Sequence, residues 1–287
     1  MRFDNYHPAI ELLYFAAVFL MTIYFDHPIY VLISFVTAVI YSVYLRGKKA
    51  AVCDLLLLAA MAAYAIYYAS YHHFGVTGLK TNFIGNQITL EAFAYGMVTG
   101  CRLITVLMWG SCLYVLVTTD KIVFLLGRIS PKLSLYVSIL FRSVPQIIQQ
   151  AKKIETAREG IYKGIRQGNA FERLSHTAGV LSILITWTIE DAMEKAAAMK
   201  CRGYSLKGRS AFAIYRFDNR DRSLVVAMAA MLTILFMAVM FEQTTIYYDP
   251  VIVMNPVTPL SVVFYICYVG FLCLPVGLEQ CNCKYYS

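Results

Sequence analysis

Charged residues are scarce in this chain of 287 residues. Asp, Glu, Lys and Arg make up 15% of it, whereas soluble domains hold about 25%. Apolar residues reach 59%, and the mean hydropathy is +0.60. This exceeds the roughly 45–50% apolar share of soluble proteins. One or two water-soluble domains of this length could not bury so much apolar surface, so the composition predicts an integral membrane protein.

Signatures of catalysis are also missing. The chain has no G-x-S-x-G, no H-E-x-x-H and no pair of carboxylates within an apolar run, so the common hydrolase motifs are absent. Residues 203–210 superficially match a phosphate-binding loop. However, Arg209 stands where that loop needs a lysine, and the pattern follows a predicted helix instead of a strand. We therefore expect that this chain does not hydrolyse ATP and is not an enzyme.

Cysteine and histidine patterns give little support to a metal site or a disulfide framework. The eight cysteines include no C-x-x-C pair, and most lie in apolar runs, where cysteine packs as a small residue. Cys281 and Cys283 form a C-x-C near the C-terminus, for which a metal or redox role is the lesser alternative. His72 and His73 are adjacent and point in different directions on a helix, so an interfacial pair is favoured over metal ligands. No cofactor and no metal are expected.

Long apolar runs are what the sequence has in abundance. Because about 20 helical residues cross a bilayer core of about 30 Å, each run is predicted to be a transmembrane helix. The first run carries on into the next ones without a small-residue cleavage site, so no removable signal is expected. Asp26, His27 and Pro28 predict a tight turn at the membrane surface. The six runs are residues 9–25, 28–45, 50–70, 92–118, 222–241 and 258–276.

Residues 119–221 differ in character, because apolar and charged residues alternate there at helical spacing. Pro131 and Pro145 are expected to break or kink the first part. Two or three long amphipathic surface helices are predicted, with Glu190, Asp191, Glu194 and Lys195 away from the apolar stripe. That stripe consists of Leu181, Leu184, Ile185, Thr188, Ala192, Ala196 and Met199. The fold class is therefore an all-α membrane protein with three regions: 1–118 with four spans, 119–221, and 222–287 with two spans.

The basic residues predict the orientation. Eighteen of the 25 Lys and Arg lie between Lys121 and Arg222. With six spans and both termini cytoplasmic, 23 of the 25 fall inside and only Lys80 falls outside, in line with the positive-inside rule. The short loop at Arg46 gives the same orientation. We therefore expect a multi-pass protein of the cell membrane whose region 119–221 is cytoplasmic.

Arg102 is the one basic residue placed inside a predicted span. A charge inside a span is expensive and is a functional candidate by default. Arginine can also snorkel toward the interface, and Gly96 and Gly100 just before it would allow close helix contact. A structural partner and a functional role are both open at this point.

Two arginines at predicted helix ends form the candidate site. Arg202 lies in the last turn of an alanine-rich helix, with Gly203 just beyond it, which is a favourable C-terminal cap. The simple interpretation is a well-capped helix. The alternative is that the planar fork of Arg202 enters a groove on a partner and binds carboxylates or carbonyls there. Arg158 occupies a similar setting 44 positions earlier.

These residues resemble the T component of energy-coupling factor transporters, the EcfT/CbiQ-like family. That family has two cytoplasmic coupling helices, each ending in an Ala-Arg-Gly motif. Cys201-Arg202-Gly203 followed by Tyr204 resembles the second motif, with cysteine in place of alanine. Ala157-Arg158 resembles the first, although Glu159 follows and Gly160 comes one position late. His7-Pro8, the spans and the long coupling region also match, so the resemblance covers nearly the whole chain.

The resemblance implies a transmembrane coupling subunit of an ABC importer. Two ATPase subunits bind and hydrolyse ATP, and the coupling arginines insert into grooves on them. Their closure moves the coupling helices, which reorient a separate membrane-embedded substrate-binding S component and deliver a vitamin or metal ion inward. The implied site residues are Ala157, Arg158, Cys201, Arg202 and Gly203. The implied partners are the two ATPases, the S component and the lipid bilayer.

Three other classes are weaker. A membrane-embedded enzyme would need polar residues that converge inside the spans. A stand-alone permease would need several intramembrane charges along a pathway, and the sequence argument finds only Arg102. A nucleic-acid binder is not expected, because nine acidic residues are interspersed with the eighteen basic ones between residues 119 and 222.

The orientation can be tested by cysteine-accessibility labelling. Cysteines placed near Lys80 should react with a membrane-impermeant reagent from outside, and cysteines near Lys163 should be protected until the cell is opened. The reverse pattern would contradict the predicted topology.

Overall fold

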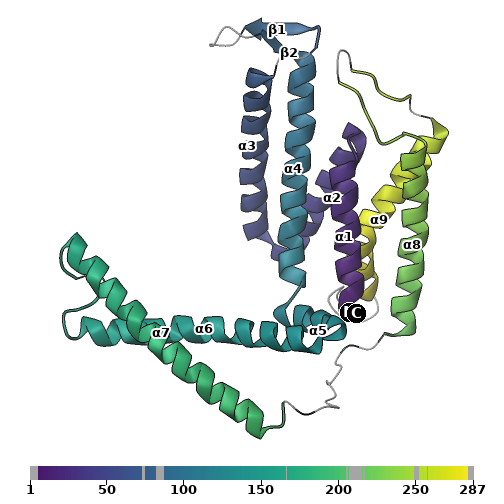
Figure 1. Ribbon diagram of the computed structural model, residues 1–287. Helices are drawn as coiled ribbons and strands as arrows, with labels where there is room; N and C mark the ends of the chain where they lie inside the picture. Colours follow the sequence, from purple (N-terminus) through teal and green to yellow (C-terminus); the bar gives the residue numbers. More distant parts are fainter. Residues whose placement is uncertain are drawn as a thin grey trace. The chain divides into compact units, whose positions relative to one another are not determined.

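The computed structural model describes residues 6–72, 75–81, 87–165, 167–204, 206, 215, 217–248, 252–256 and 258–283. They fall into two compact units (Figure 1). One, the membrane unit, comprises Met1–Thr118 with Tyr215–Ser287, and the other, the hairpin unit, comprises Thr119–Ile214. Each unit is described by itself.

The membrane unit contains six apolar helices at the places where the apolar runs predicted them. Their bounds are α1 (Pro8–Tyr24), α2 (Pro28–Arg46), α3 (Lys48–Tyr71), α4 (Leu90–Leu116), α8 (Asn219–Met240) and α9 (Pro259–Cys283). The last five each contain an apolar segment long enough to cross a bilayer, whereas α1 has 17 residues. An all-α integral membrane protein is thus confirmed, and the crossing of α1 stays a prediction.

A short β-hairpin between α3 and α4 was not expected from the sequence. Strands β1 (Gly78–Thr81) and β2 (Gln87–Thr89) pair antiparallel at the outer end of α3 and α4 in Figure 1. Glu91 in the first turn of α4 accepts hydrogen bonds from the Thr77 hydroxyl (2.7 Å) and the Thr77 backbone N–H (3.4 Å). This carboxylate therefore ties the connection to the N-terminus of α4, where negative charge is favoured.

Two His-Pro pairs start α1 and α2 in the same way. His7 and His27 have extended backbones, as residues before proline prefer. Each Nδ1 accepts a hydrogen bond from the backbone N–H two residues on, at 3.2 Å for Ala9 and 3.4 Å for Ile29. The imidazole nitrogen takes the place of the usual N-cap oxygen, and proline at the next position needs no bond because it has no N–H.

The core of the membrane unit is aromatic. Tyr14, Trp109 and Phe271 are fully buried and pack against one another from α1, α4 and α9. The Tyr14 hydroxyl donates to the Leu272 carbonyl (3.0 Å), and Trp109 Nε1 donates to Ser34 Oγ (3.2 Å). Large aromatic surfaces and a few satisfied polar tips thus join helices that are far apart in sequence.

Arg102 has a structural partner. Its guanidinium pairs with the Asp26 carboxylate in the α1–α2 turn and also donates to the Ile23 carbonyl at 3.3 Å. The same turn is held from a third side, since the backbone N–H groups of Asp26 and His27 both donate to the Thr244 carbonyl, at 3.1 and 3.0 Å. Arg102 therefore fastens α4 to a turn that also carries the α8–α9 connection.

Arg102 is not the only charge among the apolar helices, and on this point the sequence argument was wrong. Glu11 in α1 is fully buried and Asp54 in α3 is 6% exposed. Both were overlooked because single carboxylates near the ends of long apolar runs do not change the hydropathy of the run. Of the histidine pair, His72 stacks on Tyr68 with ring centroids 4.0 Å apart, and His73 lies outside the described residues.

The His27 cap predicts a stability that depends on pH. Burial lowers the pKa of His27, and protonation would also remove the Nδ1 acceptor. Because the folded pKa lies below the unfolded value of about 6.5, the cap contributes fully above that pH and is lost as pH falls toward the folded value. We expect about 1 kcal/mol of stability to be lost on acidification.

The measurement is thermal unfolding of the purified chain in nanodiscs between pH 8 and pH 5. His27→Asn is the matched control, because asparagine keeps a cap acceptor but does not titrate in this range. Its unfolding temperature should fall less than that of the wild type below pH 6.5. Parallel curves for the two proteins would contradict the role given to His27.

Candidate functional site

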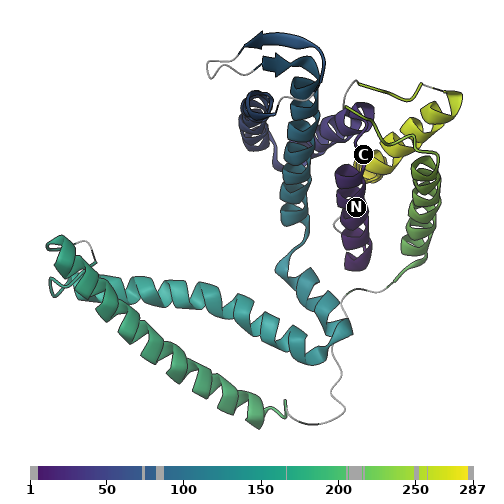
Figure 2. The ribbon, with the colours of Figure 1, turned by 45° about the horizontal axis from the view of Figure 1, so that its top comes forward.

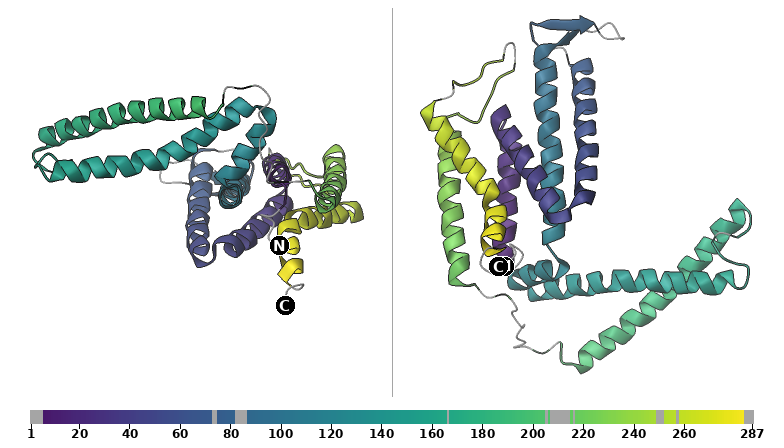
Figure 3. Two further views of the ribbon diagram at one scale, coloured as in Figure 1. Left: turned by 90° about the horizontal axis from the view of Figure 1, so that it is seen from below. Right: turned by 180° about the vertical axis from the view of Figure 1, so that it is seen from behind.

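The hairpin unit consists of three helices: α5 (Thr119–Ile129), α6 (Pro131–Glu159) and α7 (Ala170–Cys201). Of the two expected breaks, Pro131 separates α5 from α6, whereas α6 continues through Pro145. Ser134 Oγ donates to the Val123 carbonyl at 2.8 Å and joins the first two helices. Figures 2 and 3 show α6 and α7 running back along each other from the loop that joins them.

The contact between α6 and α7 uses part of the predicted apolar stripe. A groove of about 190 Å³ lies between the two helices. Lys195, placed off the stripe by the sequence argument, belongs to this interface: its Nζ donates to Gln146 Oε1 (2.7 Å) and pairs with Asp191 (2.5 Å). Leu181 and Ile185, placed on the stripe, are exposed. The groove is lined by Ile139, Ser143, Ile147, Thr188, Asp191, Ala192, Lys195, Ala196 and Met199.

Arg202 sits at the C-cap of α7. Beyond it, Gly203 adopts a left-handed backbone with φ of 73°. The N–H of Gly203 donates to the Lys200 carbonyl (3.0 Å), and the N–H of Tyr204 donates to the Met199 carbonyl (3.2 Å). These are the 5→2 and 6→1 bonds of a Schellman motif. The motif satisfies the last carbonyls by backbone alone and leaves the exposed Arg202 side chain available.

Arg158 is presented differently. The chain turns after α6 with Tyr162, not Gly160, in the left-handed conformation, at φ of 55°. The N–H groups of Tyr162 and Lys163 donate to the carbonyls of Glu159 (3.1 Å) and Arg158 (2.9 Å). Arg158 thus lies four residues before the left-handed position, whereas Arg202 lies directly before it. The expected likeness of the two helix ends does not extend to their geometry.

The Arg158 guanidinium lies against α7 at Gly179. A methyl group built at Gly179 would come within 2.7 Å of both Nη atoms, so only glycine allows this close approach. Arg158 Nε also donates to the Lys163 carbonyl at 3.3 Å. The sequence argument missed Gly179, although an isolated glycine inside a helical pattern is a recognisable signal of close packing.

The five predicted residues therefore occupy two places. Ala157 and Arg158 lie beside the α6–α7 loop, and Cys201, Arg202 and Gly203 lie at the far end of α7. Along α7, Gly179 and Arg202 are roughly 35 Å apart at 1.5 Å per residue. One hairpin can thus present two arginines to two separate binding sites, but not to one.

Exposed apolar stripes run along both long helices. Their spacing of mostly three or four residues places each set on one face of its helix, and contiguous apolar surface of this kind marks an interaction site. The residues are Leu133, Tyr136, Leu140, Val144 and Ile148 on α6, and Leu174, Leu181, Ile185, Ile189 and Met193 on α7.

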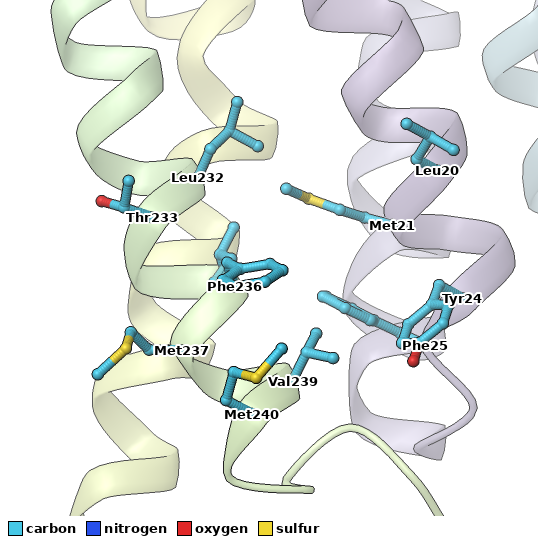
Figure 4. A pocket seen from close by; sticks show the side chains of 11 residues that line it. Leu20, Met21, Tyr24, Phe25, Leu232, Thr233, Phe236, Met237, Val239 and Met240 are labelled. Carbon is cyan, nitrogen blue, oxygen red and sulfur yellow. The ribbon is translucent and has the colours of Figure 1, made fainter.

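Neither a metal centre nor a polar substrate pocket stands out in the part of the chain that the structure describes. There, no three His, Cys, Asp or Glu side chains come together in a way that could hold a metal ion. A groove of about 740 Å³ between α1 and α8 is lined almost wholly by apolar side chains, with Tyr24 and Thr233 as its polar members (Figure 4). Its lining suits hydrocarbon and offers little to a polar or ionic solute.

The helices and the site together define a multi-pass membrane protein with a separate helical hairpin. Residues 5–212 match the model of the cobalt transport protein family. Since the match covers more than half of the chain, this protein belongs to that family and is a membrane component of a transporter. The match ends before α8, which is narrower than the near-complete resemblance expected from the sequence.

A curated relative agrees with this assignment. The energy-coupling factor transporter transmembrane protein EcfT of Listeria innocua serovar 6a is 26% identical over 161 residues, which cover 52% of this chain and 61% of the relative. The chain thus spans about three fifths of the length of the relative it matches.

The two glycines after the arginines provide a matched pair of variants. Gly203→Ala forces a side chain into a left-handed backbone, and its Cβ would lie 3.0 Å from Leu206 Cδ1. It should cost about 1–2 kcal/mol. Gly160 is right-handed and its Cβ would make only ordinary contacts, so Gly160→Ala should be neutral or stabilise by up to about 1 kcal/mol.

Hydrogen exchange of the amides of residues 200–204 and 158–163 in the full-length protein measures both effects. Gly203→Ala should speed exchange at the end of α7, and Gly160→Ala should leave the end of α6 unchanged or slower. Equal effects of the two substitutions would show that the capping geometry is wrongly assigned.

Proposed function

We propose that this chain is the transmembrane coupling subunit of an energy-coupling factor importer for a vitamin or metal ion. It transmits the closure of two ATPase subunits to a membrane-embedded substrate-binding S component. The observation that carries the proposal is the hairpin with two arginines roughly 35 Å apart, one of them exposed directly before a left-handed glycine. The family and the EcfT relative support a transport role for the same residues.

Each arginine has a separate task in this proposal. The Arg202 side chain enters a groove on one ATPase, where its five N–H donors bind carboxylate or carbonyl oxygens. Arg158 enters the second ATPase with Ala157 beside it, and its rest position against Gly179 holds it until it docks. Cys201 and Gly203 are small residues that let the groove wall approach the helix end.

The apolar stripes on α6 and α7 suit the second partner. An S component embedded in the membrane offers apolar helix faces, and the stripes are the complementary surface on the hairpin unit. When ATPase closure displaces the two arginines, the helices that carry them move the stripes. The substrate is bound by the S component, in keeping with the apolar lining of the α1–α8 groove.

The proposed placement follows from the basic residues. Region 119–221 lies in the cytoplasm with both termini, and the spans of residues 1–118 and 222–287 lie in the cell membrane. Only this orientation gives soluble ATPases, with cytoplasmic ATP, access to Arg158 and Arg202. No nucleic acid and no catalytic residue enter the proposal.

Substitution of Arg202 tests the proposal. If Arg202 docks in an ATPase groove, Arg202→Ala should cost about 2 kcal/mol or more of binding, which is roughly a 30-fold loss of affinity. Arg202→Lys should rescue poorly, because a point charge lacks the planar fork. Arg158→Ala should act in the same direction but less severely, and the double variant should abolish uptake.

The measurements are co-purification of the ATPases with the chain from membranes, and uptake of ⁵⁷Co²⁺ and of labelled B vitamins by cells. Lys200→Ala is the matched control, because Lys200 is an exposed cation in the same last turn. It loses the same helix-end interaction of about 0.3–1 kcal/mol but no fork. If the double variant, inserted at normal levels, still assembled with the ATPases, the coupling role of the arginines would be wrong.

A further inference from the structure

A buried polar cluster joins α2, α3 and α4 at the end of the membrane unit where Gly47 connects α2 to α3, here named the Gly47 end. Arg46, the last residue of α2, donates from Nη2 to Ser42 Oγ (3.0 Å) and to Ser111 Oγ of α4 (2.5 Å). Ser42 Oγ in turn donates to Asp54 Oδ1 of α3 at 3.3 Å. One guanidinium thus reaches a second helix directly and a third through a single serine.

The cluster is deeply buried. Ser42 is inaccessible and Asp54 is 6% exposed. Arg46 Nε and Asp54 Oδ2 are both buried without a hydrogen-bond partner, even though a direct pairing of two such groups is a favourable geometry for a buried charge pair. The arrangement therefore gives up charge pairing in order to keep the bond from Arg46 to α4.

Ser111 is well placed to hold α4 still. It lies five residues before the end of α4 at Leu116, and only Val117 and Thr118 separate that end from α5. Any pull on the hairpin unit reaches the membrane unit first through this short connection. Ser111 Oγ also donates to the Met108 carbonyl (2.6 Å), so its acceptor lone pairs face Arg46 in a fixed orientation.

We propose that Arg46 is the residue that anchors the Gly47 end of α4 to α2 and α3. The anchor keeps α4 in place when the hairpin unit is displaced, so that the displacement is passed to the membrane partner and is not absorbed by α4. The anchoring concerns the membrane unit alone. Its part in transmission rests on the proposed function.

A native cysteine reports on the anchor. Cys112 follows Ser111 and is fully buried, and Cys101 lies on the same helix at intermediate exposure. In membranes that contain the full-length chain, N-ethylmaleimide labelling followed by peptide mass spectrometry gives the ratio of Cys112 to Cys101 modification. Arg46→Gln and Ser111→Ala should each raise this ratio by about tenfold or more, because a hydrogen bond to a charged group is lost and α4 opens locally.

Two variants separate anchoring from general loosening. Ser111→Thr keeps the hydroxyl acceptor and should restore a low ratio. Thr99→Ala removes a hydroxyl of α4 that bonds only to the Tyr95 carbonyl of its own helix, and it should leave the ratio unchanged. If Arg46→Gln and Ser111→Ala both labelled like the wild type, or if Thr99→Ala rose as much as they do, the anchor would be refuted.

The role in transmission is measured on the complex with the ATPases, nucleotide-free and trapped with ATP and vanadate. In the wild type Cys112 should stay protected in both states, whereas in Arg46→Gln trapping should raise its labelling further. Equal labelling of Arg46→Gln in both states, or exposure of wild-type Cys112 on trapping, would overturn the transmission role. Arg46→Gln should still assemble with the ATPases. Loss of assembly in Arg202→Ala tests the proposed function separately.

Discussion

The membrane unit depends on the satisfaction of polar groups where no water can reach them. A charge or hydroxyl among apolar helices is costly unless a neighbouring helix bonds to it, so each bonded group fixes the relative position of the helices that share it. Arg102 with Asp26 does this at one end of the unit, and Arg46 with Ser42, Asp54 and Ser111 does it at the other. Apolar contacts with lipid and between helices are similar in energy, so these polar bonds supply much of the specificity of the packing.

The hairpin unit solves a different problem, which is to present two cations at the ends of long helices without using them as caps. At Arg202 the Schellman bonds and a left-handed glycine satisfy the helix end, so the side chain has no structural duty there. At Arg158 the guanidinium rests on Gly179 and donates to Lys163. The first arginine is thus ready to bind, and the second must leave a seat. Two similar sequence motifs therefore predict two unequal binding events.

Much of the fold could be predicted from the sequence, and the errors have definite causes. Runs of apolar residues locate helices well, because a bilayer needs about 20 of them in a row. The same averaging hid Glu11 and Asp54, whose single charges do not lower the hydropathy of a run. The apolar stripe of α7 identified the helix but misplaced its buried face, since Lys195 turns inward to Gln146 while Leu181 stays exposed. A partner surface and a packed surface are both apolar, and periodicity cannot tell them apart.

The sequence by itself determined the membrane class, the helix positions, the two arginines and the glycine that follows Arg202, because these depend on local composition and on backbone preferences of single residues. The tertiary structure alone decided which residues meet. Gly179 receives Arg158 from a helix 21 positions away, and Ser111 receives Arg46 from 65 positions away. Such pairings depend on how helices cross and rotate against each other. That geometry results from packing summed over whole helices, so no short stretch of sequence encodes it.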